Sequence, residues 1–391
     1  MSEEKNVPKL RFPGFTEPWE QRKLGEYVSI TSGEAPSKFE VGTELYVKVD
    51  DLNYNDKYVV DTQNKVAEHS TVKRVTKGSV VFPKRGAAIM TNKVRIMGID
   101  GYMDTNMMAL TSEKLDSEFL YNIISKEGLY KIADTSTIPQ INNKHVEPYE
   151  VTIPSLDEQR KIGAYFKQLD HLITLHQRKL GHVKDLKKSM LQKMFPKNGE
   201  LYPEVRFPGF TAAWEQRKLG EVATFINGRA YSQDELLDEG KYKVLRVGNF
   251  YTNDSWYYSD LELPDKFYAQ EGDLLYTWSA TFGPHIWHGN KVIYHYHIWK
   301  VELSDKLDKT FTLQLLEEDK ANILANKNGS TMVHITKEGM EQKQISIPSS
   351  VQEQAQIGAY FEQLDNLITL HQRELDHLQL LKKGMLQQMF V

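Results

Sequence analysis

The sequence predicts an α+β fold, in which two similar α/β domains are separated by two long antiparallel coiled-coil helices and related by a pseudo-two-fold internal repeat. Three observations lead to this prediction. The chain of 391 residues repeats itself with a period near 195 residues, each repeat ends in a long segment with heptad spacing, and the middle of each repeat carries short β-strand patterns.

The repeat is strongest at the two ends of each half. Residues 11–26 match 206–221 at 14 of 16 positions, and 162–195 match 357–390 at 25 of 34. The segments between these blocks diverge almost completely. This pattern favours one scaffold that presents two different surfaces, and unselected drift of the loops is the alternative. We therefore expect a first domain at 1–152, a helix with its linker at 153–199, a second domain at 200–346 and a second helix at 347–391.

The divergent middles still share a faint strand pattern. Residues 47–49 correspond to 245–247, and 78–82 correspond to 272–276. Both pairs are short apolar runs next to turn residues, a pattern that favours β-strands.

The closing segment of each half reads as a helix of roughly 40 residues. Each begins with a Pro and a capping-box pattern, at Ser155–Glu158 and Ser350–Glu353, and continues with heptad spacing over five heptads. At ~1.5 Å per residue such a helix spans about 60 Å, which exceeds the ~40 Å width of a 150-residue domain. A single amphipathic helix packed on a globular core is the alternative. The expected seam residues are Ile162, Phe166, Leu169, Ile173, His176, Leu180, Ile357, Phe361, Leu364, Ile368, His371 and Leu375.

Antiparallel pairing of these helices predicts a polar layer near their midpoints, where His176 meets His371. A polar pair at one seam layer fixes register at some cost in stability. The same register predicts that Lys187 lies against Tyr360 and Phe361, and that Lys382 lies against Tyr165 and Phe166.

Composition excludes several classes of protein. The chain has no cysteine, so disulfide frameworks, thiolate metal sites and thiol nucleophiles are excluded. It opens MSEEKNVPKL, without the apolar stretch of a signal peptide, and no run approaches the ~20 apolar residues of a membrane helix. We expect a cytoplasmic protein with no membrane partner.

Charge gives a mixed indication of nucleic-acid binding. The net charge of −4 argues mildly against DNA, because duplex-binding proteins usually carry a basic footprint. However, the segment 153–199 has ten basic and four acidic residues, and two acid-free windows lie between Glu68 and Asp100 and between Asp273 and Glu302. The first window is basic, and the second is rich in aromatic residues and histidine. Either window can also be an ordinary solvated strand pair.

The motifs in combination resemble one family. RFPGFT followed by WEQRKLGE opens each half, Ile-Pro-Ser with Glu-Gln leads into each long helix, and LITLHQR occurs at 172–178 and 367–373. Over its whole length the chain is similar to the specificity subunits of type I restriction-modification systems. The resemblance implies two target recognition domains, each of which reads one part of a split double-stranded DNA site, with the helices setting the gap. It also implies two methyltransferase (modification) subunits and, in the full nuclease, two restriction subunits as partners.

Enzyme signatures are missing from the sequence. It contains no Asn-Pro-Pro-aromatic tetrapeptide, no G-x-G-x-x-G loop and no G-x-x-x-x-G-K motif. We therefore expect a non-catalytic subunit without a cofactor, and S-adenosylmethionine, ATP and Mg only in the partner subunits. The histidines His285, His288, His295 and His297 cluster in the sequence but lack a nearby Cys or carboxylate. We therefore expect no metal site and interpret them as surface or base-contacting histidines.

Candidate DNA contacts combine cations for phosphates with amides, hydroxyls and aromatic rings for base edges. For each of them a solvated surface side chain is the alternative, and Trp278 can equally be a core residue. In the first domain the candidates are Lys73, Lys84, Arg85, Asn92, Lys93 and Arg95. In the second domain they are Arg229, Tyr231, Arg246, Asn249, Trp278, Ser279, His285 and Lys291.

Two other functions stay open at this point. One is a stand-alone sequence-specific DNA-binding regulator that needs no enzymatic partner. The other is a protein–protein scaffold that never contacts DNA, which the acidic net charge favours.

Overall fold

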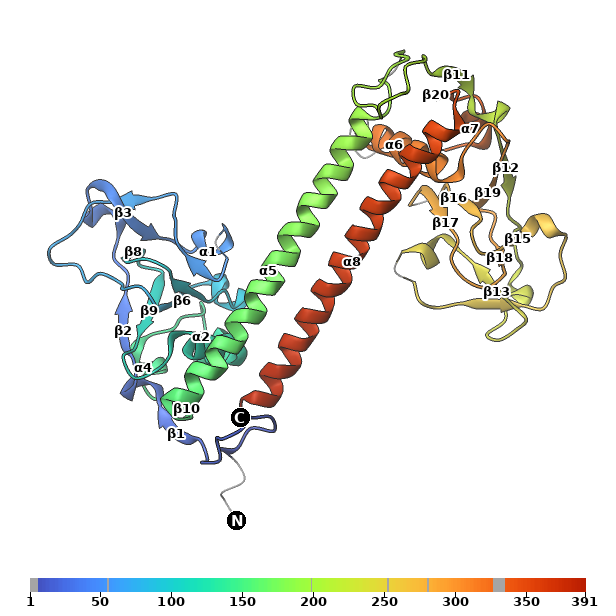
Figure 1. The fold of residues 1–391 in the computed structure, drawn as a ribbon. Helices are drawn as coiled ribbons and strands as arrows, with labels where there is room; N and C mark the ends of the chain where they lie inside the picture. The colour runs from blue at the N-terminus through green and yellow to red at the C-terminus, as the bar shows by residue number, and fades with distance from the viewer. Residues whose placement is uncertain (1–5, 55, 198, 252, 280, 326–334) are drawn as a thin grey trace. The chain divides into compact units, whose positions relative to one another are not determined.

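The computed structural model describes residues 6–54, 56–197, 199–251, 253–279, 281–325 and 335–391, which fall into two compact units. The first unit is Met1–Lys179 with His371–Val391, and the second is Leu180–Leu370. Two long helices, α5 (Leu156–Lys193) and α8 (Val351–Met389), each belong partly to both units, with the division after Lys179 in α5 and after Leu370 in α8 (Figure 1). Each unit therefore contains one domain, the first part of the helix that follows it and the last part of the other helix.

The domain of the first unit is built on a five-stranded sheet in the order β2-β9-β6-β7-β4 and a three-stranded sheet in the order β5-β3-β8. All four residues of β6 are buried, as their continuous apolar sequence requires. The strands are β1 (Glu20–Lys23), β2 (Ser29–Ser32), β3 (Val41–Val47), β4 (Tyr58–Val59), β5 (Lys65–Val66), β6 (Val80–Pro83), β7 (Arg95–Met97), β8 (Gly101–Met103), β9 (Met107–Thr111) and β10 (Glu150–Ile153). The short helices are α1 (Asp51–Tyr54), α2 (Ser117–Glu127), α3 (Leu129–Ile132) and α4 (Asn143–Val146).

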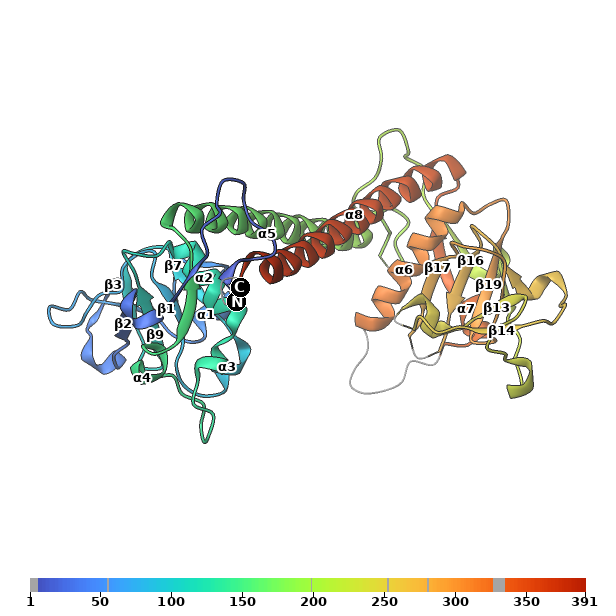
Figure 2. The ribbon, with the colours of Figure 1, turned by 90° about the horizontal axis from the view of Figure 1, so that it is seen from below.

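The domain of the second unit has two four-stranded sheets, in the orders β12-β19-β16-β17 and β14-β13-β18-β15, and α6 packs against β17 (Figure 2). Its strands are β11 (Glu215–Lys218), β12 (Ala223–Asn227), β13 (Tyr242–Leu245), β14 (Tyr257–Ser259), β15 (Tyr268–Ala269), β16 (Leu274–Thr277), β17 (Gly283–Ile286), β18 (Val292–Tyr294), β19 (Ile298–Leu303) and β20 (Gln344–Ile347). Its helices are α6 (Lys309–Ala325) and α7 (Lys337–Glu341).

An antiparallel ribbon joins the beginning and the end of each domain. In the first unit β1 pairs with β10, and in the second β11 pairs with β20 in the equivalent register. The identical sequence Glu-Gln-Arg-Lys forms both β1 and β11. The ribbon delivers the chain directly into α5 or α8, so the start of each helix is fixed on its own domain.

A buried ion pair closes the same junction. Arg11 donates to both carboxylate oxygens of Glu158, at 2.7 and 2.8 Å, and Arg206 does the same to Glu353, at 2.6 and 2.8 Å. Both glutamates are buried. In a complete capping box these carboxylates would accept from the backbone amide of the helix N-cap. Here they accept from arginine instead. The glutamate at each helix entry therefore holds the arginine of the RFPGF segment rather than only the helix end.

The last turn of each long helix completes the core of the other half's domain. In the first unit the ring of Phe390 lies 5.4 Å from that of Phe119 and 5.9 Å from that of Trp19. In the second unit Phe195 lies 5.5 Å from Phe311 and 6.0 Å from Trp214. The four aromatic partners are buried parts of the domain cores. Neither core is complete without a residue from the helix of the other repeat.

The helices run antiparallel within each unit. In the first unit Lys382 donates to Asp170 at 2.6 Å, and the Nδ1 atoms of His371 and His176 are 3.4 Å apart. In the second unit Lys187 donates to Asp365 at 2.5 Å. The predicted meeting of the two histidines is found. The predicted contacts of Lys187 and Lys382 with aromatic rings are wrong. Each ammonium instead binds a carboxylate that lies one turn away from the predicted phenylalanine on the facing helix.

The predicted seam residues serve two purposes. Ile162, Phe166 and Leu169 are buried and belong to the core of the first domain, and Ile357, Phe361 and Leu364 have the same place in the second. Leu180 and Leu375 are also buried, whereas Ile173, His176, Ile368 and His371 are half-buried. The first half of each helix is thus both an amphipathic helix on its own domain and one side of the helix pair.

The cross-inserted phenylalanine should dominate the stability of each unit. We expect Phe390→Ala to lower the free energy of unfolding by about 3–5 kcal/mol, because it leaves a cavity among Trp19, Phe119 and Phe166. Thermal or denaturant unfolding measures the effect. Leu380→Ala on the same helix is the control, since Leu380 is 69% exposed, and it should change stability by less than about 0.5 kcal/mol. Equal effects of the two substitutions would contradict the inserted position of Phe390.

The histidine pair makes a separate prediction about stability. A polar pair at one layer of an apolar seam fixes register at some cost in stability. We expect the combined substitution His176→Leu and His371→Leu to raise the melting temperature, measured by thermal unfolding. A double variant with a lower melting temperature would show that the contact between the two rings stabilises the helix pair.

Candidate nucleic-acid interface

Four loops meet at one edge of the first domain. The amide of Gly33 donates to Met107 O at 3.2 Å, and that of Glu34 to Met103 O at 2.9 Å. Asp104 N donates to Val47 O at 2.9 Å, and Lys84 N donates to Asn106 O at 2.8 Å. We call residues 33–36, 47–51, 84–85 and 103–107 the four-loop face of this domain.

The second domain repeats these backbone bonds one for one. Gly228 N donates to Ile298 O and Arg229 N to Tyr294 O, both at 3.1 Å. His295 N donates to Leu245 O at 3.0 Å, and Trp278 N donates to His297 O at 3.1 Å. Residues 228–231, 245–249, 278–279 and 294–298 therefore form the four-loop face of the second domain.

Glycine is required where the loop at 33–36 crosses the loop at 103–107, and where the loop at 228–231 crosses the loop at 294–298. A Cβ on Gly33 would lie 2.0 Å from Asp104 O, and one on Gly228 would lie 2.4 Å from His295 O. Because both contacts are with backbone, neither can be relieved by a side-chain movement. The two glycines stand 195 residues apart, at the repeat period, and keep the loops in the same contact in both domains.

The face of the first domain mixes cations and carboxylates. Burial lowers the pKa of Lys84, the charge of Arg85 lowers it further, and the carboxylates of Glu34 and Asp104 act against both. Asp104 Oδ1 accepts from the amide of Asn106 at 2.9 Å and from its side chain at 2.8 Å. These side chains lie close enough to act together on one ligand that presents both acceptors and donors.

The face of the second domain is rich in imidazole and aromatic rings. The rings of His295 and His297 are 5.0 Å apart, and burial lowers the pKa of both imidazoles, with the charge of Arg246 adding to the effect on His295. Arg246 lies over the ring of Tyr257 at 4.3 Å. Trp278 stacks on Trp299 and donates from Nε1 to Tyr296 O at 3.0 Å. Flat rings and neutral imidazoles at such an edge suit contact with base edges more than with phosphates.

Only part of the predicted set in the first domain lies on this face. Lys84 and Arg85 are on it. The side-chain amide of Asn92 is used inside the domain, since it donates to Ser125 O at 2.8 Å and accepts from Leu129 N at 3.0 Å. Lys93 donates to Asn53, and Arg95 donates to Leu52 O at 2.7 Å. Lys73 is exposed elsewhere, beside β2 and α4.

In the second domain six of the eight predicted residues lie on the face. They are Arg229, Tyr231, Arg246, Asn249, Trp278 and Ser279. Arg229 is engaged by both oxygens of Glu235, at 2.9 and 2.6 Å, and Asn249 accepts from Arg246 N at 3.0 Å, so these two hold the loops. His285 stacks on Phe250 at 4.1 Å, and Lys291 lies over Tyr268 at 3.9 Å, both outside the four loops.

Sequence reasoning did not select several residues of the two faces. They are Glu34, Lys48, Asp104, Asn106 and Tyr296, whereas the sequence indicates His295 and His297 only as surface or base-contacting histidines. Three of these are acidic or neutral residues in the first domain, which a search for basic windows passes over. The paired glycines Gly33 and Gly228 were a usable signal, because a glycine kept at the repeat period inside divergent segments indicates a shared backbone crossing.

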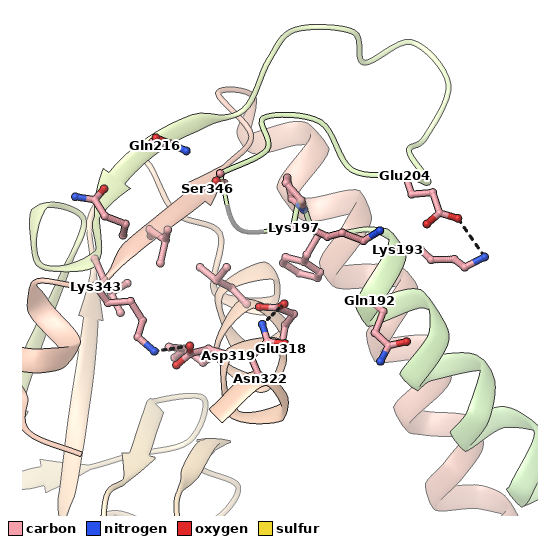
Figure 3. A pocket seen from close by; sticks show the side chains of 18 residues that line it. Gln192, Lys193, Lys197, Glu204, Gln216, Glu318, Asp319, Asn322, Lys343 and Ser346 are labelled. Carbon is pink, nitrogen blue, oxygen red and sulfur yellow. Dashed lines mark hydrogen bonds and ion pairs between the residues drawn. The ribbon is translucent and has the colours of Figure 1, made fainter. Parts of the chain in front are cut away.

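A hollow lies in the second unit, away from the four-loop face of the second domain. It has a volume of about 930 Å³ and is formed in the second unit by β11, β20, α6 and the end of α5 (Figure 3). Lys343 pairs there with Asp319, and Lys193 with Glu204 at 3.3 Å.

Within the described ranges, no three His, Asp or Glu side chains are placed to hold a metal ion. Across the same ranges, no helix is both long and apolar enough to cross a membrane.

A duplicated frame that carries two equivalent but chemically different loop faces defines a recognition protein with two reading domains. Residues 16–185 and 212–380 both match the family model of the type I restriction modification DNA specificity domain. The chain belongs to this family, that of the type I restriction-modification specificity subunits, and its two matched segments are DNA sequence recognition domains.

Relatives and solved structures agree with the family. The type I restriction enzyme MjaVIII specificity subunit of Methanocaldococcus jannaschii is 22% identical, over 97% of this chain and 93% of the relative. The crystal structure of a type I restriction-modification S subunit from M. genitalium superposes with a TM-score of 0.69 at 16% identity, covering 98% of this chain and 99% of that one. A structure from a study of complex assembly and conformational transition of the type I system gives a TM-score of 0.53 at 19% identity, with coverages of 97% and 98%.

His285 makes the second domain sensitive to acid. Burial, together with the charge of Lys320, lowers the pKa of His285 to about 4. The unfolded chain takes up this proton near pH 6.5, so the contribution of His285 to stability is complete above about pH 6.5 and is lost as the pH falls toward 4. We expect His285→Gln to lose less stability than the unsubstituted chain between pH 7.5 and pH 5, measured by denaturant unfolding. His182→Gln is the matched control, because His182 is exposed on α5 in the same unit, and it should change stability by less than about 0.5 kcal/mol at either pH.

Proposed function

We propose that this chain is the non-catalytic reader of a bipartite double-stranded DNA site, in which each four-loop face recognises one half-site. The observation that carries the proposal is the pair of faces. Their backbone hydrogen bonds correspond one for one, whereas nearly every side chain at corresponding positions differs. Two scaffolds with equivalent loop contacts and different surface chemistry suit the recognition of two different sequences.

We propose further that the chain directs two methyltransferase subunits, and two restriction subunits in the full nuclease, to that site. The repeat supports two copies of one partner, because the chain presents its frame surfaces twice. Leu172 on α5 and Leu367 on α8 occupy the same repeat position, and both are exposed, at 40% and 43%. S-adenosylmethionine, ATP and Mg are then needed by the partners and not by this chain. Because the DNA that it reads is cellular DNA, we propose a cytoplasmic location.

The acidic net charge does not argue against this role. The ten basic residues of 153–199 are concentrated on α5 and its linker, and Lys84 and Arg85 stand on the first four-loop face. Local cations rather than the net charge determine phosphate contact. A salt series of duplex binding separates this proposal from a scaffold without DNA contact, since neutralised phosphates give a negative slope of log affinity against log salt.

Exchange of one domain tests the proposal directly. Residues 22–150 are replaced with the corresponding segment of a relative, and the methylated motif is sequenced in cells that carry the chain with its methyltransferase. We expect one half of the motif to change and the other half and the gap to stay, because the frame is retained. The reciprocal exchange of 217–345 should alter only the other half.

Three outcomes would contradict it. A change in both halves, or in neither, would show that the domains are not independent readers. DNA binding without association of any methyltransferase would favour the stand-alone regulator instead.

A further inference from the structure

Asp104 and His295 occupy the same place in the two domains. Each donates its backbone amide to the last residue of the neighbouring strand, Val47 or Leu245. Each also accepts at its carbonyl from the amide three residues on, that of Met107 or Ile298, at 2.9 Å in both domains. The two side chains therefore leave equivalent points of two equivalent loops.

The chemistry at this shared position is opposite in the two domains. Asp104 presents a carboxylate, whose Oδ1 accepts from Asn106. Its Oδ2 lies 3.5 Å from the hydroxyl of Tyr46, which donates instead to Glu34 O at 2.7 Å. That oxygen keeps its capacity to accept a hydrogen bond.

His295 lies among aromatic rings and next to the strand end that leads into Arg246. Its ring is 5.0 Å from that of His297 and 4.4 Å from that of Tyr296, and its backbone amide donates to Leu245 O, the residue before Arg246. Arg246 donates from one terminal nitrogen to Ser255 O at 3.0 Å, while its buried Nε has no partner. The guanidinium retains donors and is held over Tyr257, so its direction is set before a ligand arrives.

The equivalent positions of Asp104 and His295 limit which part of the DNA these two side chains can contact. A carboxylate such as that of Asp104 repels a phosphate, so a domain that docked with this position against the DNA backbone would bind poorly. The same docking of both domains therefore places Asp104 and His295 at base edges. In the major groove a carboxylate accepts from the exocyclic amine of cytosine, and a guanidinium and an imidazole N–H donate to O6 and N7 of guanine.

We propose that Asp104 and His295 are matched specificity-determining positions. Asp104 selects a base with an exocyclic amino group in the half-site of the first domain, and His295 with Arg246 selects guanine in the half-site of the second. This inference rests on the proposed function, since it assigns base chemistry to the two readers.

The test compares the methylated motifs of three variants in cells that carry the chain and its methyltransferase. Asp104→Asn keeps the acceptor that binds Asn106 but turns Oδ2 into a donor, so preference at one position of the first half-site should fall about tenfold or more. His295→Asn should relax one guanine of the second half-site by a similar factor. His288→Asn, an exposed histidine on the β17–β18 turn, is the matched control and should leave the motif intact.

Two results would overturn the inference. One is an unchanged motif with unchanged affinity, and the other is an unchanged motif with equally weaker binding of all duplexes, which would make these residues phosphate contacts. If His295→Asn fails to fold in thermal melting, Arg246→Lys tests the same guanine, because it keeps the charge and loses the fork. If the unsubstituted chain yields no bipartite motif, the proposed function itself fails, which is distinct from failure of a variant.

Discussion

The structure depends on an exchange of aromatic side chains between the two repeats. Phe390 ends the second long helix and lies in the core of the first domain, and Phe195 ends the first long helix and lies in the core of the second. A buried aromatic side chain contributes several kcal/mol, which is a large part of the stability of a domain of this size. Folding of each domain is therefore tied to the correct antiparallel pairing of the helices within its unit.

The ion pairs at the helix entries and in the seam give that pairing its register. Arg11–Glu158 and Arg206–Glu353 fix where each helix begins, and Lys382–Asp170 and Lys187–Asp365 fix how the facing helix lies against it. Because Glu158 and Glu353 are buried, displacement of a helix entry leaves an uncompensated charge and is costly. The seam pairs are partly exposed and contribute less each. The identity of the two repeats at these positions follows from this requirement, since both junctions use the same contacts.

The sequence could predict the frame because the frame is periodic and repeated. Heptad spacing identified the helices, and the midpoints of the two helices placed His176 opposite His371, whose Nδ1 atoms are 3.4 Å apart. The partner of Lys187 was wrong because spacing alone does not choose between Tyr360 and the nearby Asp365, and a carboxylate binds an ammonium more strongly than a ring does. The candidate site was harder, since Asn92, Lys93 and Arg95 follow Lys84 in sequence but turn into the domain after a short helical segment, whereas Asp104 reaches the face from the far end of β8.

The separation of frame and face explains how two domains of one chain can diverge so far. The four-loop faces are held mainly by backbone amides and carbonyls and by the close crossings at Gly33 and Gly228. Asp104 adds one side-chain bond within its loop, because its Oδ1 accepts from the amide of Asn106, and an asparagine at 104 keeps that acceptor. A substitution that keeps such a bond leaves most of the loop contacts in place, which is the reverse of the situation at Phe390 or Glu158. Because the loops of both domains keep the same backbone contacts, a change in recognition requires no change in the way a domain meets its helices. The chain thus confines variation to positions where stability does not oppose it.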